Sequence, residues 1–146
     1  MALANISLPP AKLEPVVELY RRTGLQSGHS GADLKVSVAT HMYIRENSQA
    51  ALDEFYPYYA AYFLTHTPSQ YRAQPITRAD YDARAGQHGP ICVGSPQQII
   101  DKILYERELF GHQRFLAQID IGGLPFAKVA RVIELFAMKV APVIRG

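Results

Sequence analysis

The stretch from Ile91 to Gly146 most constrains the fold, because it lays out three structural units in order. Gly94-Ser95-Pro96 marks a helix start: Ser95 supplies an N-cap oxygen, and Pro96 suits the first helical position, where its missing N–H costs nothing. Apolar residues then recur at helical spacing and predict one buried face: Ile99, Ile100, Ile103 and Leu104. Gly111 is placed to end this helix.

The second unit of this stretch, residues 114–121, is short, apolar and bounded by glycines, which is typical of a strand. A further helix follows Pro125, with its predicted buried face formed by Phe126, Val129, Val132, Ile133 and Phe136. Helix, strand and helix joined by tight glycine turns indicate an α/β fold with a parallel sheet.

The first half of the chain repeats this alternation. Residues 1–6 read as a buried strand, and a helix follows the prolines at positions 9 and 10, ending near Gly24. Its predicted buried face is Leu13, Val16, Val17 and Tyr20. Residues 34–44 are β-branched and form the strongest strand prediction. Ser48 opens a long helix, which Pro57 is expected to kink or delay.

Residues 65–89 are the polar part of the chain. Thr77 is placed to cap a short helix that ends at Ala85, and the rest reads as loop. We therefore predict a single domain over 1–146. Its parts are two βα units in 1–64, an insertion or loop in 65–90, and the last βα unit with a C-terminal helix in 91–146.

Composition limits the classes of function. The 146 residues, 48% of them hydrophobic, suffice for one core. A net charge of +2 without a basic block argues against nucleic acid, and the lack of a run of about 18 apolar residues argues against a membrane span. Cys92 is the only cysteine, which excludes an intramolecular disulfide and suits the cytoplasm. The five histidines show no metal-ligand spacing, so no metal site is expected.

Several separated motifs, in the right order, resemble the luciferase-like monooxygenase family. They are VGSPQQIIDKI, FGHQRFLAQIDIGGLP and VIELFAMKVAPVIR, preceded by LEPVVELYRRTGLQSGH and FYPYYAAY. The resemblance covers nearly the whole chain. It implies a partial (β/α)8 TIM barrel, about the last three βα units with a helical insertion, since whole barrels of this kind are roughly twice as long.

The family resemblance also implies a chemistry. Such enzymes use reduced FMN, or the deazaflavin F420 in some branches, with O2 to oxidise an aldehyde, sulfonate, alkane or related substrate. The usual catalytic histidine lies in the part of the barrel that this sequence does not match, so no position here inherits it. The resemblance thus implies a truncated enzyme that is inactive alone.

Barrel enzymes place function at the carboxyl ends of the strands. In this chain those positions are Asn5, Ser7, Thr40, His41, Gln118 and Asp120, which we take as candidate cofactor- or substrate-binding residues. His41 titrates near neutral pH, but a histidine in an apolar strand is also a common core residue. Asp120 precedes two glycines and could equally cap a turn.

Two further features have two interpretations each. The helix start at Gly94-Ser95-Pro96 could hold a phosphate or be only a turn. Tyr56, Tyr58, Tyr59 and Tyr62 could form an amphipathic packing face, or the aromatic wall of a pocket or subunit interface.

An open three-stranded sheet would have two unpaired edges and an apolar face, which favour association. We therefore expect a homodimer or larger oligomer, with a separately encoded N-terminal half-barrel as the competing partner. Three functions follow: a flavin-dependent monooxygenase or half of a split one, a catalytically degenerate oligomeric binding or scaffold module, or a fragment without independent function.

Overall fold

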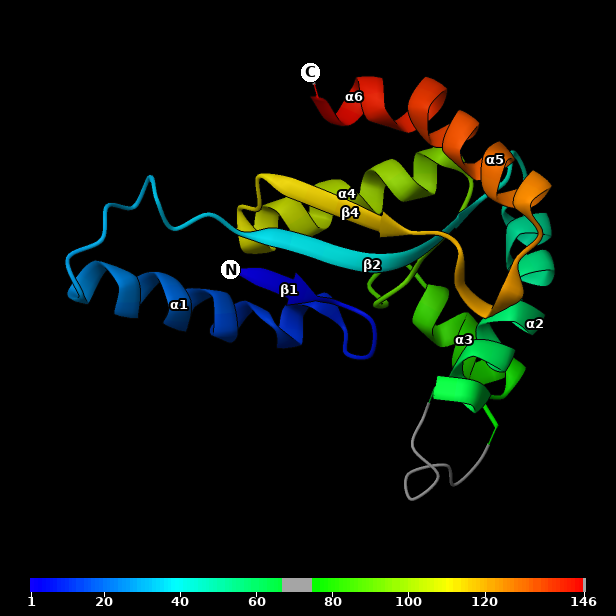
Figure 1. Ribbon diagram of the computed structural model, residues 1–146, viewed down its shortest axis with the longest axis horizontal. Coiled ribbons are helices and arrows are strands. Elements are labelled where there is room, and N and C mark those ends of the chain that lie inside the picture. Colours follow the sequence, from blue (N-terminus) through cyan, green and yellow to red (C-terminus); the bar gives the residue numbers. More distant parts are fainter. Residues whose placement is uncertain (67–74, 146) are drawn as a thin grey trace.

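A computed structural model describes residues 1–66 and 75–145, and a parallel β-sheet runs through its middle (Figure 1). The strands are β1 (Ala2–Ala4), β2 (Ser37–Ile44), β3 (Cys92–Gly94) and β4 (Arg114–Gln118). Every pairing between them is parallel, with helices in the connections. The predicted α/β class with a parallel sheet is confirmed.

The long strand β2 organises the sheet. Its first half pairs with both β1 and β4, which therefore lie on opposite edges of β2. Its last three residues, Met42–Ile44, pair with β3. The sequence analysis missed β3, because the strand has only three residues and its last one, Gly94, was assigned to the start of the following helix.

Two helices cover one face of the sheet. These are α1 (Glu14–Gln26), which follows the short 3-10 turn η1 (Pro10–Lys12), and α4 (Pro96–Phe110). Alternation along the strands points one set of side chains toward them. The resulting core cluster joins strands and helices: Leu3, Val17, Val36, Val38 and Phe110.

The opposite face is largely uncovered. By alternation it carries Ala2, Ala4, Ser37, Ala39, Arg114 and Leu116, all at least partly exposed. The prediction of an apolar face is therefore wrong in part, because most of these side chains are small or polar and Leu116 is the one large apolar group among the six. Figure 1 shows no helix in front of the left part of β1, β2 and β4.

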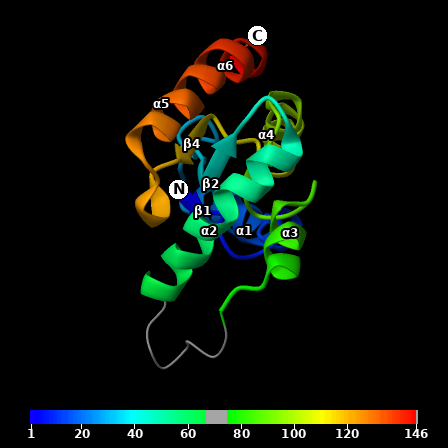
Figure 2. The same ribbon diagram turned by 90° about the vertical axis from the view of Figure 1, so that its right-hand side faces the viewer.

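At the carboxyl end of the sheet, α2 (Ser48–His66) runs across the strands (Figure 2). Its side chains Phe55 and Tyr59 are fully buried in the larger core cluster, with Tyr43 of β2 stacked on Phe55 at 5.0 Å between ring centroids. The helix begins at Ser48 and continues through Pro57, so of the two expected effects of this proline the delayed start is excluded. Tyr59 supports the packing interpretation of the tyrosine run.

The C-terminal segment forms one helical run: α5 (Phe126–Leu135), a π-helical turn η4 (Phe136–Val140) and α6 (Ala141–Arg145). The turn η4 and α6 pack against α4, and α5 packs against β2; the buried side chains of the run include Val132, Leu135 and Val140. Phe126 is 82% exposed and Ile133 is 52% exposed, so two of the five residues predicted for the buried face point to solvent.

The caps were predicted well. Ser95 and Gln98 form a reciprocal capping box at the start of α4, and Gly111 ends that helix at φ 53°. Thr77 and Asp80 form a second capping box at α3 (Arg78–Ala85). Two smaller predictions are wrong, because Val16 and Leu104 are exposed, whereas α1 ends at Gln26, close to the predicted Gly24.

Candidate functional site

An open hollow of about 430 Å³ lies at the carboxyl end of β4, against α2. Two residues predicted from the sequence, Gln118 and Asp120, line it. The remaining lining residues come from the last turns of α2 and from the 3-10 turn η3 (Ile121–Gly123): Ala61, Tyr62, Thr65, His66, Ile121, Gly122 and Gly123.

The turn η3 fixes the floor of this hollow against α2. Gly122 has φ +67°, and a Cβ built there would lie 1.9 Å from the Tyr58 carbonyl oxygen of α2. Only glycine permits this approach at this backbone angle. The chain therefore leaves β4 and turns directly onto the helix, which places Gln118 and Asp120 beside the end of α2.

His41 lies next to the hollow and is fully buried. It is the cross-strand partner of Gln118 in the β2–β4 register, and its ring lies edge-on to Tyr62, with 5.1 Å between centroids. Neither ring nitrogen has a hydrogen-bond partner among the described residues. Burial lowers the pKa of His41 to about 4, and the nearby Gln118 side chain opposes this only in part. The imidazole is therefore neutral at physiological pH.

Tyr62 separates His41 from His66 at the mouth of the hollow. Its ring stacks on His66 at 4.3 Å between centroids, and His66 Nδ1 lies 2.9 Å from the Tyr62 carbonyl oxygen. Tyr62 thus lies between the buried imidazole and the hollow. The lining can offer an amide, a carboxylate and an aromatic surface to one ligand.

The other three candidate residues do not join this group. Asn5 Nδ2 donates to Glu106 Oε1 at 2.5 Å on the helix-covered side, and Thr40 Oγ1 donates to the Pro90 carbonyl oxygen at 2.6 Å. Alternation explains this, because Thr40 and His41 are neighbours and point to opposite faces. Ser7 is exposed in the loop after β1.

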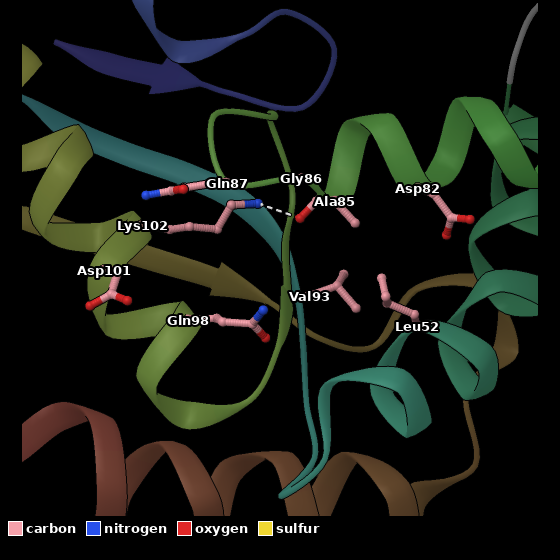
Figure 3. A pocket seen from close by; sticks show the side chains of 9 residues that line it. All are labelled: Leu52, Asp82, Ala85, Gly86, Gln87, Val93, Gln98, Asp101 and Lys102. Carbon is pink, nitrogen blue, oxygen red and sulfur yellow. Dashed lines mark hydrogen bonds between the residues drawn. The ribbon is translucent and has the colours of Figure 1, made fainter.

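Sequence reasoning missed a pair of buried charged residues on α4. Lys102 is 4% exposed and Glu106 is 2% exposed. Lys102 Nζ donates to the Ala85 carbonyl oxygen at 3.0 Å and to that of Ile91, beside a hollow of about 280 Å³ between α3 and α4 (Figure 3). Burial lowers the pKa of Lys102 and raises that of Glu106 to about 7. The i, i+4 spacing of Lys102 and Glu106 on one predicted helix was the sequence signal that could have revealed this pair.

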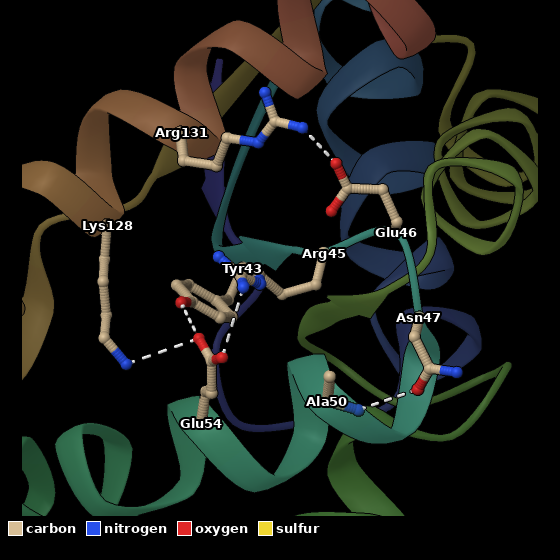
Figure 4. A network of polar contacts seen from close by, with 8 residues as sticks. All are labelled: Tyr43, Arg45, Glu46, Asn47, Ala50, Glu54, Lys128 and Arg131. Carbon is tan, nitrogen blue, oxygen red and sulfur yellow. Dashed lines mark hydrogen bonds and ion pairs between the residues drawn. The ribbon is translucent and has the colours of Figure 1, made fainter.

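A polar network fastens α5 to the end of β2 and the start of α2 (Figure 4). Tyr43 Oη donates to Glu54 Oε2 at 2.7 Å, and Lys128 Nζ lies 3.3 Å from the same oxygen. Arg131 pairs with Glu46 on the surface nearby. Exposed pairs of this kind contribute roughly 0 to 1 kcal/mol each, and together these contacts tie α5 to β2 and α2.

Two kinds of site find no support in the described residues. No group of three or more His, Cys, Asp or Glu side chains among them is arranged to hold a metal ion. None of the helices in that part of the chain combines the length and the apolar character needed to cross a membrane.

Comparison with known families decides the ancestry of the chain. The family model described as luciferase-like monooxygenase matches residues 1–113. The chain belongs to this family. Among curated protein sequences, no match was found.

Three solved structures share the fold of this luciferase-like chain. Monooxygenase RslO1 from Streptomyces bottropensis superposes with a TM-score of 0.73 at 22% identity over 98% of this chain. The F420-dependent tetrahydromethanopterin reductase from Methanopyrus kandleri gives 0.60 at 18% identity over 97%. The oxygenating constituent of 3,6-diketocamphane monooxygenase from Pseudomonas putida, in complex with FMN, gives 0.62 at 18% identity over 94%.

The luciferase-like chain spans less than half of these relatives. It covers 41% of RslO1 and of the diketocamphane enzyme, and 44% of the reductase. Identities below 25% make the likeness one of fold.

Proposed function

We propose that this chain is the C-terminal part of a flavin-dependent luciferase-like monooxygenase and forms the last three βα units of a (β/α)8 barrel. The order β1-β2-β4, parallel and with helices between consecutive strands, supports this assignment. Helix α3 belongs to the insertion of residues 65–90, and the extra strand β3 follows it at the start of the last part, 91–146. On this proposal residues 1–146 are a single domain, although residues 67–74 of the insertion lie outside the described part.

The observation that carries the proposal is the clustering of His41, Gln118 and Asp120 at the carboxyl end of the sheet. A flavin ring carries hydrogen-bond donors and acceptors on a flat aromatic surface. The Gln118 amide and the Asp120 carboxylate suit such an edge, and Tyr62 and His66 suit the ring face. The unpaired imidazole nitrogens of His41 give a further polar group that lacks a partner.

The bound reduced flavin supplies the activation of O2, which protein side chains cannot perform. The residues of this chain bind and orient. Gln118 and Asp120 fix the ligand in the hollow, and Tyr62 controls its access to His41. We take FMN as the first cofactor to test, with F420 as the second, because relatives with this fold use one or the other by name.

Oxygenation by this chain alone is not part of the proposal, because it covers at most 44% of the three relatives compared. The uncovered sheet face and the outer edges of β1 and β4, which carry no strand among the described residues, favour association with a second copy. A homodimer is our proposal, and a separate N-terminal half-barrel is the competing partner. Without flavin affinity, the chain would be a binding or scaffold module.

The test is a fluorescence titration of the purified chain with FMN and with F420, each oxidised and then reduced. We expect saturable binding in the micromolar range for one of the two. Gln118→Ala should weaken it about tenfold, the effect of losing roughly 1.4 kcal/mol. Gln87→Ala, an exposed glutamine outside the hollow, should leave it unchanged. Absence of saturation up to about 1 mM, an affinity of only roughly 4 kcal/mol, would refute flavin binding.

A further inference from the structure

A second hollow lies at the other end of β4, where α4 ends and α6 approaches the strand (Figure 1). Its volume is about 360 Å³. The residues on which the argument depends are Arg107, His112, Arg114, Phe115, Phe136 and Arg145. Because β4 separates this hollow from the one beside Gln118, the two sites are independent.

The charge of this hollow is strongly one-sided. Three arginines line it, and no acidic side chain does so among the described residues. None of the three takes part in an ion pair within residues 1–66 and 75–145. Arg107 Nη2 donates to the Ile144 carbonyl oxygen, which ties α4 to α6 and leaves the other guanidinium N–H groups available.

His112 adds a buried donor to the arginines. It is 6% exposed, and neither ring nitrogen has a hydrogen-bond partner in the described part of the chain. Burial lowers the pKa of His112, and the Glu106 backbone near the ring opposes this only in part, so the neutral imidazole presents one N–H and one acceptor nitrogen. A buried polar group without a partner costs about 1 to 3 kcal/mol, and a ligand that bonds to it recovers part of that cost.

The walls of the hollow are apolar. Phe115 lies 6.3 Å from the His112 ring between centroids, and Phe136 lines the side formed by the C-terminal helical run. A bare anion would leave these rings without a partner. A ligand with an anionic head and a small apolar or aromatic body would contact both the arginines and the rings.

We propose that this hollow binds a phosphate monoester with a small apolar or aromatic body. Guanidinium groups match phosphate oxygens in geometry and charge, and three of them suit a dianion better than a single carboxylate. Arg114 and Arg145 hold the phosphate, and His112 donates from the buried side. Arg107 adds charge while it fixes α6. The assignment does not depend on flavin binding at the opposite end of β4.

The test is calorimetric titration of the chain with phenyl phosphate, inorganic phosphate and benzoate. Phenyl phosphate should bind most tightly, because it alone of the three combines a dianionic phosphate for the arginines with an aromatic ring for the walls. Arg114→Gln and Arg145→Gln should each weaken its binding about tenfold. Arg22→Gln, an exposed arginine on α1 outside this hollow, is the matched control and should leave the affinity unchanged.

Nuclear magnetic resonance of the histidine rings provides the second readout. Phenyl phosphate should shift the His112 ring resonances in the wild type and in Arg22→Gln, and leave those of His29 in place. Three results would overturn the proposal. The first is no saturation by phenyl phosphate up to about 10 mM, and the second is tighter binding of benzoate than of phenyl phosphate. The third is an affinity that depends only on the charge of the ligand and falls equally in Arg114→Gln, Arg145→Gln and Arg22→Gln.

Discussion

His41 and Gln118 are paired across β2 and β4, yet one is fully buried and the other lies in the open hollow. The difference arises because α2 crosses the end of β2 and places Tyr62 over the His41 ring. The pair thus joins a solvent-accessible amide to an imidazole that a single aromatic side chain separates from the ligand site. This relationship underlies both the proposed binding role and the acid sensitivity expected of the fold.

The first prediction concerns stability at acid pH. Because the pKa of His41 is about 4 when folded and about 6.5 when unfolded, the unfolded chain takes up a proton first. The contribution of the neutral His41 side chain to the free energy of unfolding is therefore complete above pH 6.5 and is lost as the pH falls toward 4. The loss is about 3 kcal/mol at 1.36 kcal/mol per pKa unit. Urea unfolding at pH 7 and pH 4 measures it.

His41→Phe provides the comparison, since it keeps an aromatic ring but cannot titrate. The variant should lose about 3 kcal/mol less than the wild type between pH 7 and pH 4. Equal losses in the two proteins would show that His41 takes up a proton as readily in the folded chain as in the unfolded chain.

The second prediction concerns Glu106, whose contribution to the free energy of unfolding changes with pH in the opposite direction to that of His41. Its pKa is about 7 when folded and 4.5 when unfolded, so the folded chain holds the proton more tightly. Its stabilising contribution is present below pH 4.5 and is lost as the pH rises to 7. Glu106→Gln keeps the acceptor for Asn5 and cannot ionise. It should therefore raise the free energy of unfolding by up to about 3 kcal/mol at pH 8 and change it little at pH 4.5. A destabilised variant at pH 8 would contradict this account.

The glycine pair of η3 predicts unequal responses to one substitution. Both residues have positive φ, but only at Gly122 would a Cβ strike the Tyr58 carbonyl oxygen, whereas at Gly123 it would meet open space. Gly122→Ala should therefore cost about 3 kcal/mol or more, and Gly123→Ala only about 1 kcal/mol. Thermal unfolding of the two variants measures the difference, and equal losses would show that η3 does not lie tightly on α2.

Local chemistry made parts of this fold predictable. Both capping boxes follow from side chains three residues apart, and the left-handed end of α4 follows from Gly111. The strand β2 was recognised because β-branched residues alternate along it. The motifs that resemble the family placed these elements in order, and the family model itself matches residues 1–113.

Packing between distant elements was not predictable from local patterns. Val16 and Ile133 occupy apolar positions on amphipathic helices, but nothing in the described residues covers them. The contact between Asn5 and Glu106 joins residues 101 positions apart. Among the six candidate site residues, alternation separates Thr40 from His41, and the role of Tyr62 depends on how α2 crosses the sheet, which its own sequence does not encode.

The exposed strand edges predict self-association. Multi-angle light scattering at micromolar concentration should give twice the mass of one chain. Leu116→Glu introduces a charge on the uncovered sheet face and should shift the protein toward monomer. Leu104→Glu, on the exposed side of α4, serves as the control. A monomer in the wild type would exclude the homodimer and favour a separate partner.

The most direct test of the account is a nuclear magnetic resonance titration of the isotope-labelled chain with FMN. Binding at the proposed site predicts shifts in the Gln118 side-chain amide and the His41 ring, with the His88 ring, which lies away from this hollow, unchanged. Shifts confined to other residues, or none up to about 1 mM FMN, would contradict a flavin site at the carboxyl end of β2 and β4.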